Sequence, residues 1–427
     1  MDLEKLKDRK GLLSRRIGEA KKAGKDTADL LAEMRSVSGE LKALKEQQKN
    51  AQKPALNPSN SDDTGHTNVM PIRFECHQGD ENLQFTTRLV TDEDKLLWDA
   101  YVDSSPKASL YHRWEFKRFV ELAFGHHTYY LAAFSVDGRV CGVFPLVELK
   151  SSLFGHFLVS MPFFNYGGII SSSQSIADKL RHASIELAKK LNVSHIEERS
   201  IRSETSWLQK SNKVSVIRDL PSSVEQLWKD IGTKVRAQIK KAQKNELIVE
   251  VGGIDKLDDF YGVFSENMRD LGTPVYGKSM FTQLFRLEVA QSFFIVVVYK
   301  ADKPVSAGFL MGDRDVMEIP WASTLRSVNA LNANMLLYWH CLSLAVEKQY
   351  GFFDFGRSSK DASTLRFKKQ WGGRQYPLYW HYWLSSGGDL PELNPNNPKY
   401  RILIAVWQRL PLWLTRLLGP YVVKYLP

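Results

Sequence analysis

The sequence predicts an α+β protein in which two related halves follow a helical hairpin. Its 427 residues exceed the size at which one hydrophobic core keeps growing, so two domains with appendages are expected. A strand–turn–strand motif occurs twice, and apolar residues near the N-terminus recur with helical spacing. These observations divide the chain into a helical coiled-coil hairpin, a flexible linker, a first domain, a second domain and a basic amphipathic tail, at residues 1–49, 50–83, 84–225, 226–387 and 388–427.

The N-terminal segment is expected to fold as an antiparallel pair of helices. Apolar side chains recur in alternating steps of three and four over residues 3–20 and again over residues 30–44. Gly24 can end the first helix, and Asp26 or Thr27 can cap the second. The segment that follows is rich in Asn, Ser, Asp, Gln and Pro and has almost no apolar periodicity, which is typical of a flexible linker.

The repeated motif is a β-hairpin whose second strand contains a glycine, Gly142 in the first copy and Gly308 in the second. Each hairpin is followed by a helix that runs into a further strand. Because the agreement extends over hairpin, helix and closing strand, we interpret the body as a duplicated domain. The matched segments are residues 128–145 with 293–310, and residues 187–199 with 345–357.

The composition indicates a folded, basic protein without a disulfide framework. With 43% hydrophobic and 25% charged residues, the chain has ample material for packed cores. The formal net charge of +10 favours anionic partners such as nucleic acid, phosphorylated substrates or an acidic membrane surface, although a solvated basic surface on an ordinary enzyme is the alternative. The three cysteines, Cys76, Cys141 and Cys341, lie too far apart in sequence for a metal motif or a disulfide framework.

Neither a signal peptide nor a membrane-spanning segment is expected. The N-terminus is charged from the start, and no uncharged run approaches the ~20 residues that span a bilayer. We therefore expect a cytoplasmic protein. Residues 399–418 mix apolar and aromatic side chains with Arg401, Arg409 and Arg416. This tail is expected either to make a peripheral contact with the inner membrane or to pack back on the body.

The repeated unit resembles the GNAT acyltransferase fold, which has an antiparallel hairpin, a glycine in its central strand, a helix whose N-terminus faces the acyl donor, and a closing strand. The pairing of two such units, together with three runs of the second half, resembles the Fem family of peptidoglycan-bridge aminoacyl transferases. Those runs are residues 234–242 (KVRAQIKKA), 354–357 (DFGR) and 367–373 (FKKQWGG).

More closely, residues 85–385 are similar to Fem-like proteins found beside bacterial exopolysaccharide and exosortase systems. Residues 109–114 (SLYHRW) and 161–168 (MPFFNYGG) contribute to this similarity in the first half. The resemblance implies transfer of an acyl or aminoacyl group to a cell-envelope precursor, of peptidoglycan or of exopolysaccharide. The donor that it implies is aminoacyl-tRNA or acyl-CoA, without a permanently bound cofactor.

The N-terminal hairpin carries a second resemblance. Residues 15–26 and 30–41 look like the tRNA-binding arm of bacterial seryl-tRNA synthetases. Fem ligases that use aminoacyl-tRNA carry a comparable arm inside a GNAT unit, whereas here the hairpin precedes both units. A basic hairpin can bind the nucleic-acid backbone, and heptad hairpins also form dimers or act as spacers. Contact with tRNA and dimerisation are both left open.

Acyl transfer to an amine or hydroxyl requires that an anionic tetrahedral intermediate is stabilised and that the nucleophile loses a proton. The GNAT resemblance places the donor-binding strand at residues 315–323 and the next helix start at residues 326–334. The pyrophosphate-binding turn of coenzyme A users is missing, which counts against an ordinary acetyl-CoA enzyme. We take Asp354 as a general base or orienting group, and Ser323 and Asn334 as further catalytic candidates. Asparagines in this segment can instead cap a helix.

Candidate substrate-binding residues come from both halves. Basic side chains near the end of the closing strand suit a phosphate-rich substrate, with a solvated basic face as the alternative. Trp371 can stack on a sugar or a nucleobase, or belong to the core. The family resemblance assigns acceptor binding to the first half. The candidates are Tyr111, His112, Trp114, Asn165, Tyr166, Arg236, Lys240, Trp321, Tyr338, Arg357, Ser358, Arg366, Lys368, Lys369 and Trp371.

Three functions fit these observations. The first is a Fem-like aminoacyl transferase that uses charged tRNA, favoured by the hairpin, the basic charge and the missing pyrophosphate turn. The second is an N- or O-acyltransferase that uses an acyl thioester in exopolysaccharide biosynthesis, favoured by the closer resemblance and the amphipathic tail. The third is a non-catalytic binding protein with the same fold. No catalytic triad, P-loop or metal-ligand spacing is present, so no metal is expected, and we expect the second half to perform the chemistry.

Overall fold

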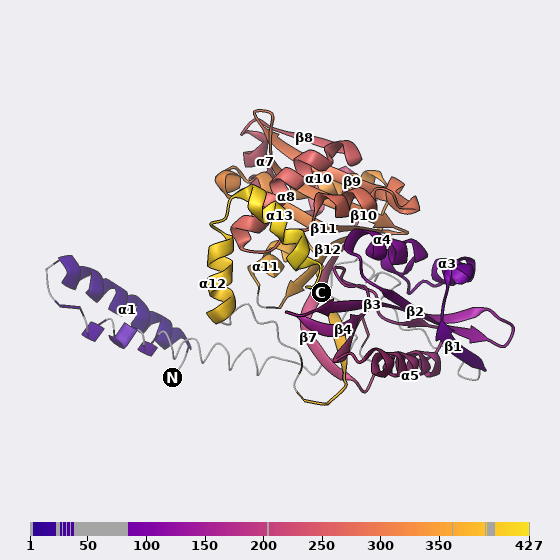
Figure 1. Ribbon diagram of the computed structural model, residues 1–427. Helices are drawn as coiled ribbons and strands as arrows, with labels where there is room; N and C mark the ends of the chain where they lie inside the picture. Colours follow the sequence, from indigo (N-terminus) through magenta and orange to yellow (C-terminus); the bar gives the residue numbers. More distant parts are fainter. Residues whose placement is uncertain are drawn as a thin grey trace. The chain divides into compact units, whose positions relative to one another are not determined.

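The computed structural model describes most of the body and part of the N-terminal segment (Figure 1). The chain forms two compact units, Met1–Asn68 and Val69–Pro427, and each is considered by itself. The described residues are 3–22, 26–27, 29–30, 32–34, 36–37, 84–202, 205–360, 362–388, 390 and 398–426.

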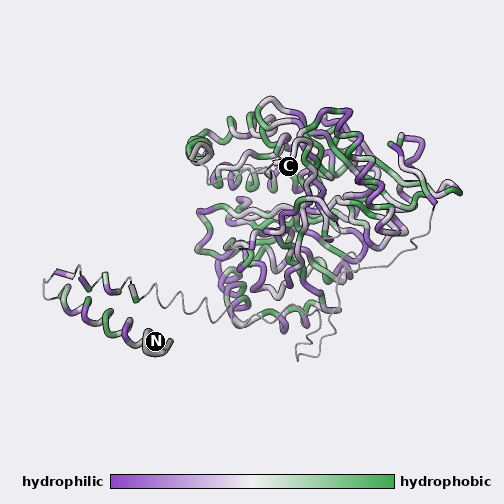
Figure 2. Tube along the Cα trace, turned by 90° about the horizontal axis from the view of Figure 1, so that it is seen from below, coloured by the Kyte–Doolittle hydropathy of each residue, from purple (hydrophilic) through white to green (hydrophobic). Residues whose placement is uncertain are grey.

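In the first unit, helix α1 (Leu3–Lys22) alternates hydrophobic and hydrophilic residues along its length (Figure 2). Its Leu13 is buried together with Val37, and the Arg9 guanidinium lies 2.7 Å from Oε1 of Glu33. An antiparallel pair of helices makes contacts of this kind, but the coiled-coil hairpin stays a prediction. Its turn, its end and the predicted linker lie outside the described residues, at positions 23–25, 38–49 and 50–83.

A mixed sheet of thirteen strands forms the centre of the described part of the second unit. The strand order is β1-β2-β3-β4-β6-β13-β7-β12-β11-β10-β9-β8, and β5 pairs with β3. Two neighbouring pairs are parallel, β4 with β6 and β11 with β12. The strands are β1 Phe85–Leu89, β2 Thr128–Ser135, β3 Val140–Ser151, β4 Gly155–Val159, β5 Ile170–Ser171, β6 His195–Ser200, β7 Leu208–Asp219, β8 Leu247–Gly252, β9 Phe293–Lys300, β10 Lys303–Asp313, β11 Val316–Thr324, β12 Phe352–Ser359 and β13 Arg374–Leu384.

The strand order is symmetric about the central pair of β13 and β7. From each edge inward, one half contributes five strands, β1-β2-β3-β4-β6 or β8-β9-β10-β11-β12. The strand that follows these five in the sheet comes from the other half. Strand β13, which ends the second half, pairs with β6, and β7, which ends the first half, pairs with β12. The halves are therefore interlocked by exchanged strands, and the predicted boundary after residue 225 falls inside α6 (Val224–Asp230).

Helices cover both faces of this sheet. On one face, α3, α4, α8 and α9 share a hydrophobic core with residues of both halves, such as Trp98 and Phe264. On the other face, α5 covers a first-half core around Leu180, and α6, α7 and α10 cover a separate second-half core around Leu342. The helices are α3 Lys95–Ser104, α4 Trp114–Phe124, α5 Gln174–Leu191, α7 Thr233–Gln243, α8 Leu257–Leu271, α9 Lys278–Leu284, α10 Ala333–Glu347 and α11 Ser363–Lys369.

The glycine of each repeat lies where a helix crosses its strand closely. A Cβ atom on Gly142 of β3 would lie 2.6 Å from Cγ2 of Ile176 in α5. On Gly308 of β10, it would lie 3.0 Å from Cδ1 of Ile319 and 3.6 Å from Sγ of Cys341 in α10. Helices α5 and α10 thus occupy equivalent places on their halves. The predicted duplication of an α+β unit is confirmed. Lack of space explains the repeated glycine, and the tight neighbour is α5 at Gly142 but Ile319 of β11 at Gly308.

The C-terminal segment forms helices α12 (Pro398–Trp407) and α13 (Leu412–Val423), which contact the body. Nε of Arg416 donates to Oγ of Ser265 in α8 at 2.9 Å. A Cβ atom on Gly419 would lie 2.7 Å from the carbonyl oxygen of Val275, so α13 lies tightly on this chain segment. Packing on the body, one of the two alternatives for the tail, is thus observed for one side of these helices. No described helix combines the length and the apolar character that crossing a membrane requires.

We expect Gly142→Ala to lower the free energy of unfolding by about 1–3 kcal/mol, because the added methyl group forces Ile176 or α5 to move. The measurement is urea-induced unfolding of the full chain. Gly262→Ala is the matched control, since a Cβ atom at Gly262 in α8 meets nothing within 4 Å. Equal losses in both variants would contradict the close packing of α5 on β3.

Candidate active site

Each half contains two neighbouring parallel strands that pair over only a few residues. In the second half, β11 pairs with β12 only over residues 316–318 and 352–354. In the first half, β4 pairs with β6 only over residues 158–159 and 196–197. In the second half, β12 bulges just beyond its last parallel pair, at Gly356, whose φ of +72° favours glycine. In the second half, β11 and β12 continue apart to Thr324 and Ser359, whereas in the first half β4 ends at its last paired residue, Val159. We call the region beyond the last parallel pair the opening of each half. In the second half, it is the place where the sequence predicts the donor-binding strand.

The opening of the first half is filled by the chain itself. Residues 160–168 follow β4 and bond to β6. The Ser160 amide donates to the Glu197 carbonyl at 2.9 Å, and the Gly168 amide donates to the Arg199 carbonyl at 2.9 Å. Nη1 of Arg199 donates to the Phe164 carbonyl at 2.8 Å. Backbone groups of β6 are therefore already satisfied by this loop, which leaves the second-half opening as the candidate for chemistry.

The same loop carries two predicted residues to the second half. The Tyr166 hydroxyl lies 2.6 Å from Oδ2 of Asp354 and 2.6 Å from Oγ of Ser215. Nδ2 of Asn165 donates to Oε1 of Glu318 at 2.9 Å. The structure thus brings Asn165 and Tyr166, predicted from the first half, together with Asp354, predicted from the second.

The Asp354 carboxylate is fully buried and surrounded by donors from the protein. Oδ1 accepts from Oγ of Ser215 at 2.8 Å and from the backbone amide of Gly356 at 2.8 Å, and Oδ2 accepts from Tyr166. Such a carboxylate holds the bulge of β12 in place. Its contacts fit the orienting role among the two roles predicted for Asp354.

Glu318 is the counterpart of Asp354 on β11, because the two residues are paired in the parallel ladder. Its Oε2 accepts from the Tyr111 hydroxyl at 2.7 Å, and its side chain is buried. Sequence reasoning missed Glu318 and the hydroxyl of Ser215. A signal was available for the first, since Glu318 is the sole charged residue of β11 and both its neighbours are apolar. A buried carboxylate is costly unless it is hydrogen-bonded.

Lys368 of α11 supplies a buried cation at the same opening. Its Nζ donates to the carbonyls of Gly356 at 2.9 Å and of Arg357 at 2.8 Å. Burial lowers the pKa of Lys368 to about 8, against the opposing effect of the negative charges of Asp354 and Glu318. An ammonium group has three hydrogens, so two are used by β12 and the third can face a substrate.

Comparisons with known proteins identify the fold. Residues 231–369 match the family described as an acetyltransferase (GNAT) domain. The structure is similar to a crystal structure of FemX, with a TM-score of 0.52, 13% sequence identity, and coverage of 75% of this chain and 100% of that chain. The chain has a tandem GNAT-like fold. At this identity, the similarity concerns the fold.

Two further solved structures resemble this chain at lower scores. One is L-PGS from Bacillus licheniformis, with a TM-score of 0.46, 11% identity, and coverage of 77% of this chain and 97% of that chain. The other is a tandem GNAT protein from the clavulanic acid biosynthesis pathway, with a TM-score of 0.45, 12% identity, and coverage of 72% and 100%. No curated protein matches the sequence.

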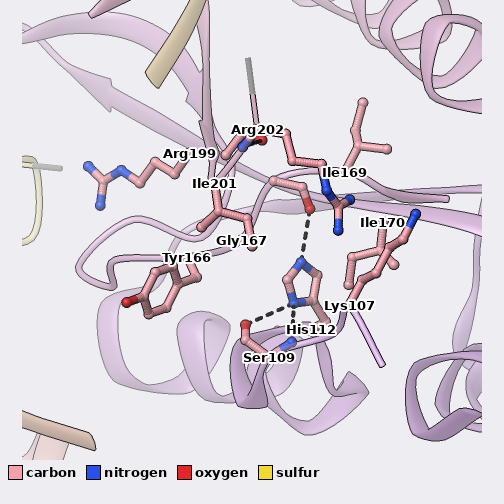
Figure 3. Close-up of a pocket in the computed structure, with 12 residues that line it drawn as sticks. Lys107, Ser109, His112, Tyr166, Gly167, Ile169, Ile170, Arg199, Ile201 and Arg202 are labelled. Carbon is pink, nitrogen blue, oxygen red and sulfur yellow. Dashed lines mark hydrogen bonds between the residues drawn. The ribbon is translucent and has the colours of Figure 1, made fainter. Parts of the chain in front are cut away.

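Two predicted residues of the first GNAT-like half have local structural partners. His112 is buried, with Nε2 2.9 Å from the Gly168 carbonyl and Nδ1 2.9 Å from Oγ of Ser109 (Figure 3). A cavity of about 30 Å³, room for about one water, lies beside it. Trp114 is buried in the core that both halves share. These contacts give both residues a structural role in the packed interior.

Three aromatic candidates of the second half also belong to hydrophobic clusters. Trp371 is fully buried, so the core alternative is observed for it. Tyr338 stacks on Phe355 with ring centres 5.9 Å apart. The Trp321 ring lies edge-on to Phe281 at 5.1 Å. These side chains support the strands that carry the site.

The remaining polar candidates have separate surroundings. Oγ of Ser323 accepts from Nδ2 of Asn267 at 3.1 Å, Asn334 lies in the first turn of α10, and Ser358 is buried on β12. Four basic candidates lie on helices at the surface, as on a solvated basic face: the half-buried Arg236 and the exposed Lys240 on α7, and the exposed Arg366 and Lys369 on α11. In the parts of the chain that the structure describes, no group of three or more His, Cys, Asp or Glu side chains could hold a metal ion.

We expect His112→Gln to remove part of the pH dependence of stability. Burial lowers the pKa of His112 from 6.5 to about 4, so the folded state favours the neutral ring. Its contribution to stability is fully present above about pH 6.5 and is lost as the pH falls toward about 4, by up to about 3 kcal/mol.

The measurement is urea-induced unfolding of the full chain at a series of pH values. His182→Gln, which replaces an exposed histidine of α5, is the control and should keep the slope of the unmodified protein. Identical slopes for His112→Gln and His182→Gln would show that His112 is not the buried neutral ring described above.

Proposed function

We propose that this chain is an acyl or aminoacyl transferase that modifies a cell-envelope precursor, with its chemistry between β11 and β12 of the second GNAT-like half. One observation carries this proposal. In the first half, residues 160–168 bond to backbone groups of β6, whereas in the second half the separated strands carry the buried carboxylates Asp354 and Glu318, and Lys368 donates to β12 beside them. The match of residues 231–369 to a GNAT acetyltransferase domain supports the assignment to this half.

In the proposed reaction, an amine or hydroxyl of the acceptor attacks the carbonyl carbon of the donor ester or thioester. The new C–N or C–O bond forms as the carbonyl oxygen takes up the negative charge, and the bond to the tRNA ribose or thiol then breaks. The nucleophile's proton leaves with the departing alkoxide or thiolate. Lys368 is proposed to stabilise the oxyanion with its third N–H, and Asp354, held by Tyr166 and Ser215, is proposed to position β12.

The sequence presents two alternatives for the donor and two for the acceptor. Aminoacyl-tRNA is favoured by the basic N-terminal segment and by the resemblance of residues 15–41 to a tRNA-binding arm. Acyl-CoA is favoured by the GNAT family match. The acceptor is a precursor of peptidoglycan or of exopolysaccharide. A non-catalytic binding protein with this fold remains the third alternative, and the hairpin is proposed either to contact tRNA or to form a dimer.

We expect Lys368→Met to lower turnover by about 10²–10³-fold, because the replacement keeps the length of the side chain and removes its charge. Lys369→Met, next to it but exposed, is the matched control and should keep near-normal turnover. Turnover should also fall as the pH rises through about 8, where Lys368 loses its proton. Equal activity of the two variants would sink this site assignment.

The same assay identifies the donor. The full chain is incubated with an extract of envelope precursors and with either aminoacyl-tRNA or acyl-CoA, and release of free tRNA or of free thiol is measured. Copurification of tRNA that is lost in Arg16→Glu, an exposed position of α1, would support the tRNA-dependent reaction. Release of thiol alone would support the thioester reaction. Release of neither product would favour the non-catalytic alternative.

We also propose a peripheral membrane contact through α12 and α13. The side of these helices that faces away from the body is apolar, and its exposed side chains define the C-terminal apolar surface. Residues 398–427 contain five lysines or arginines and no aspartate or glutamate. An apolar, aromatic surface with only basic charges around it fits an anionic lipid surface. Its members are Ile402 (68% exposed), Leu403 (63%), Val406 (52%), Trp413 (66%), Leu417 (55%) and Tyr421 (68%).

We expect the full chain to sediment with vesicles that contain phosphatidylglycerol, more strongly at low salt, and less with pure phosphatidylcholine vesicles. The double variant Trp413→Ser and Leu417→Ser should lose most of this binding. Leu96→Ser with Leu122→Ser is the control, because these leucines are equally exposed but lie on α3 and α4. If the first pair instead abolishes self-association of the protein and leaves vesicle binding unchanged, a second copy covers this surface.

A further inference from the structure

Three N–H groups without an acceptor lie around one tryptophan at the junction of the two halves. Nη2 of Arg199, Nη1 of Arg357 and Nε1 of Trp380 are covered from solvent, and none has a hydrogen-bond partner among the described residues. The guanidinium carbons of Arg199 and Arg357 lie 4.5 Å and 5.0 Å from the centre of the Trp380 ring. Buried donors without an acceptor are rare and cost free energy.

The exchanged strands create this cluster. Arg199 lies near the end of β6 and Arg357 near the end of the equivalent strand β12, so the two arginines occupy matching positions in the two halves. Trp380 lies on β13, directly opposite Arg199 in the antiparallel ladder. In Figure 3, the Arg199 side chain points away from His112 and its small cavity. The cluster is therefore separate from the packing around His112.

Positive charge is in excess here. Nε of Arg199 donates to Oε1 of Glu197 at 2.8 Å, so this arginine has a carboxylate partner. Arg357 has neither an ion pair nor a side-chain hydrogen bond with any residue that the structure describes. Burial lowers the pKa of Arg357 to about 10, and the charge of Arg199 acts in the same direction. With one carboxylate for two guanidinium groups, one positive charge is left uncompensated among Glu197, Arg199 and Arg357.

We propose that Arg199, Arg357 and Trp380 bind one singly charged oxyanion group of the substrate, a carboxylate or a phosphodiester. Guanidinium groups match the oxygen atoms of both groups, and the indole N–H supplies a further donor. A single negative charge neutralises the excess charge. Arg357 is partly exposed, so the group can enter from solvent.

The site lies beside the proposed reaction centre. The backbone carbonyl of Arg357 accepts from Nζ of Lys368 at 2.8 Å, so one residue connects the oxyanion site to the proposed catalytic cation. An acceptor anchored by its oxyanion would present its nucleophile to the opening between β11 and β12. This inference rests on the proposed function only for the identity of the molecule that carries the oxyanion.

The test is titration of the full chain with acetate, with dimethyl phosphate and with inorganic phosphate. The indole ¹H–¹⁵N signal of Trp380, assigned as the signal that disappears in Trp380→Phe, should shift and saturate with acetate or with dimethyl phosphate. The preferred anion distinguishes a carboxylate from a phosphodiester. Calorimetry should show binding at least about tenfold weaker in Arg357→Gln, as expected for loss of a charged hydrogen bond.

Arg118→Gln is the matched control, because Arg118 is exposed on α4 and its replacement should leave binding unchanged. If Arg357→Gln does not fold, Trp380→Phe keeps an aromatic ring, removes one donor and should still weaken binding. No saturable shift in the unmodified protein, or equal affinity in all variants, would overturn the proposal. Oxyanion binding without acyl transfer would uphold this site and contradict the proposed function. Acyl transfer without oxyanion binding would uphold the proposed function and contradict this site.

Discussion

The pairing of β13 with β7 is the interaction on which the rest of the body depends. Each of these strands ends one half and hydrogen-bonds to the fifth strand of the other half, β6 or β12. Without the exchange, β6 and β12 would each have an unpaired edge inside the molecule, which is costly for backbone N–H and C=O groups. The exchange also aligns the two halves so that one face of the sheet carries a common core.

The duplicated units use their equivalent openings differently. In the first half, residues 160–168 satisfy backbone groups of β6. The tip of that loop then extends to the second half, where Tyr166 contacts Asp354 and Asn165 contacts Glu318. Both carboxylates are buried, and each accepts hydrogen bonds from the loop, which offsets the cost of their burial. One copy of the fold thus supports the geometry of the other.

Much of the local structure could be predicted from the sequence, because it depends on patterns a few residues long. Alternating apolar strands, the turn between them and the repeated glycine predict the two hairpins and their helices. For the C-terminal tail, the sequence allowed either packing on the body or contact with a membrane, because its helices are apolar on more than one side. In the structure one side packs on α8 and the other is exposed, so the alternatives concern different sides of the same helices.

The candidate site could be predicted only in part. Asp354, Tyr166 and Lys368 were among the predicted residues. In the structure, Tyr166 bonds to Asp354, and Lys368 donates to carbonyls of the same strand, β12. Residue type did not distinguish Lys368, which is buried, from Lys369, which is exposed, because the direction of a side chain depends on the helix packing. Glu318 and Arg199 were missed because their importance comes from partners far away in the chain, although a charged residue in an apolar strand gives a usable signal.

The sequence by itself determined the repeated α+β unit, its hairpins and the helices that cover them. Local periodicity and the steric demand at Gly142 and Gly308 encode these features. Only the tertiary structure decided that β7 and β13 exchange partners, that residues 160–168 fill one opening, and that Arg199 and Arg357 meet around Trp380. Strands pair by the fit of edges and side chains that are distant in sequence, so no local pattern specifies these partners.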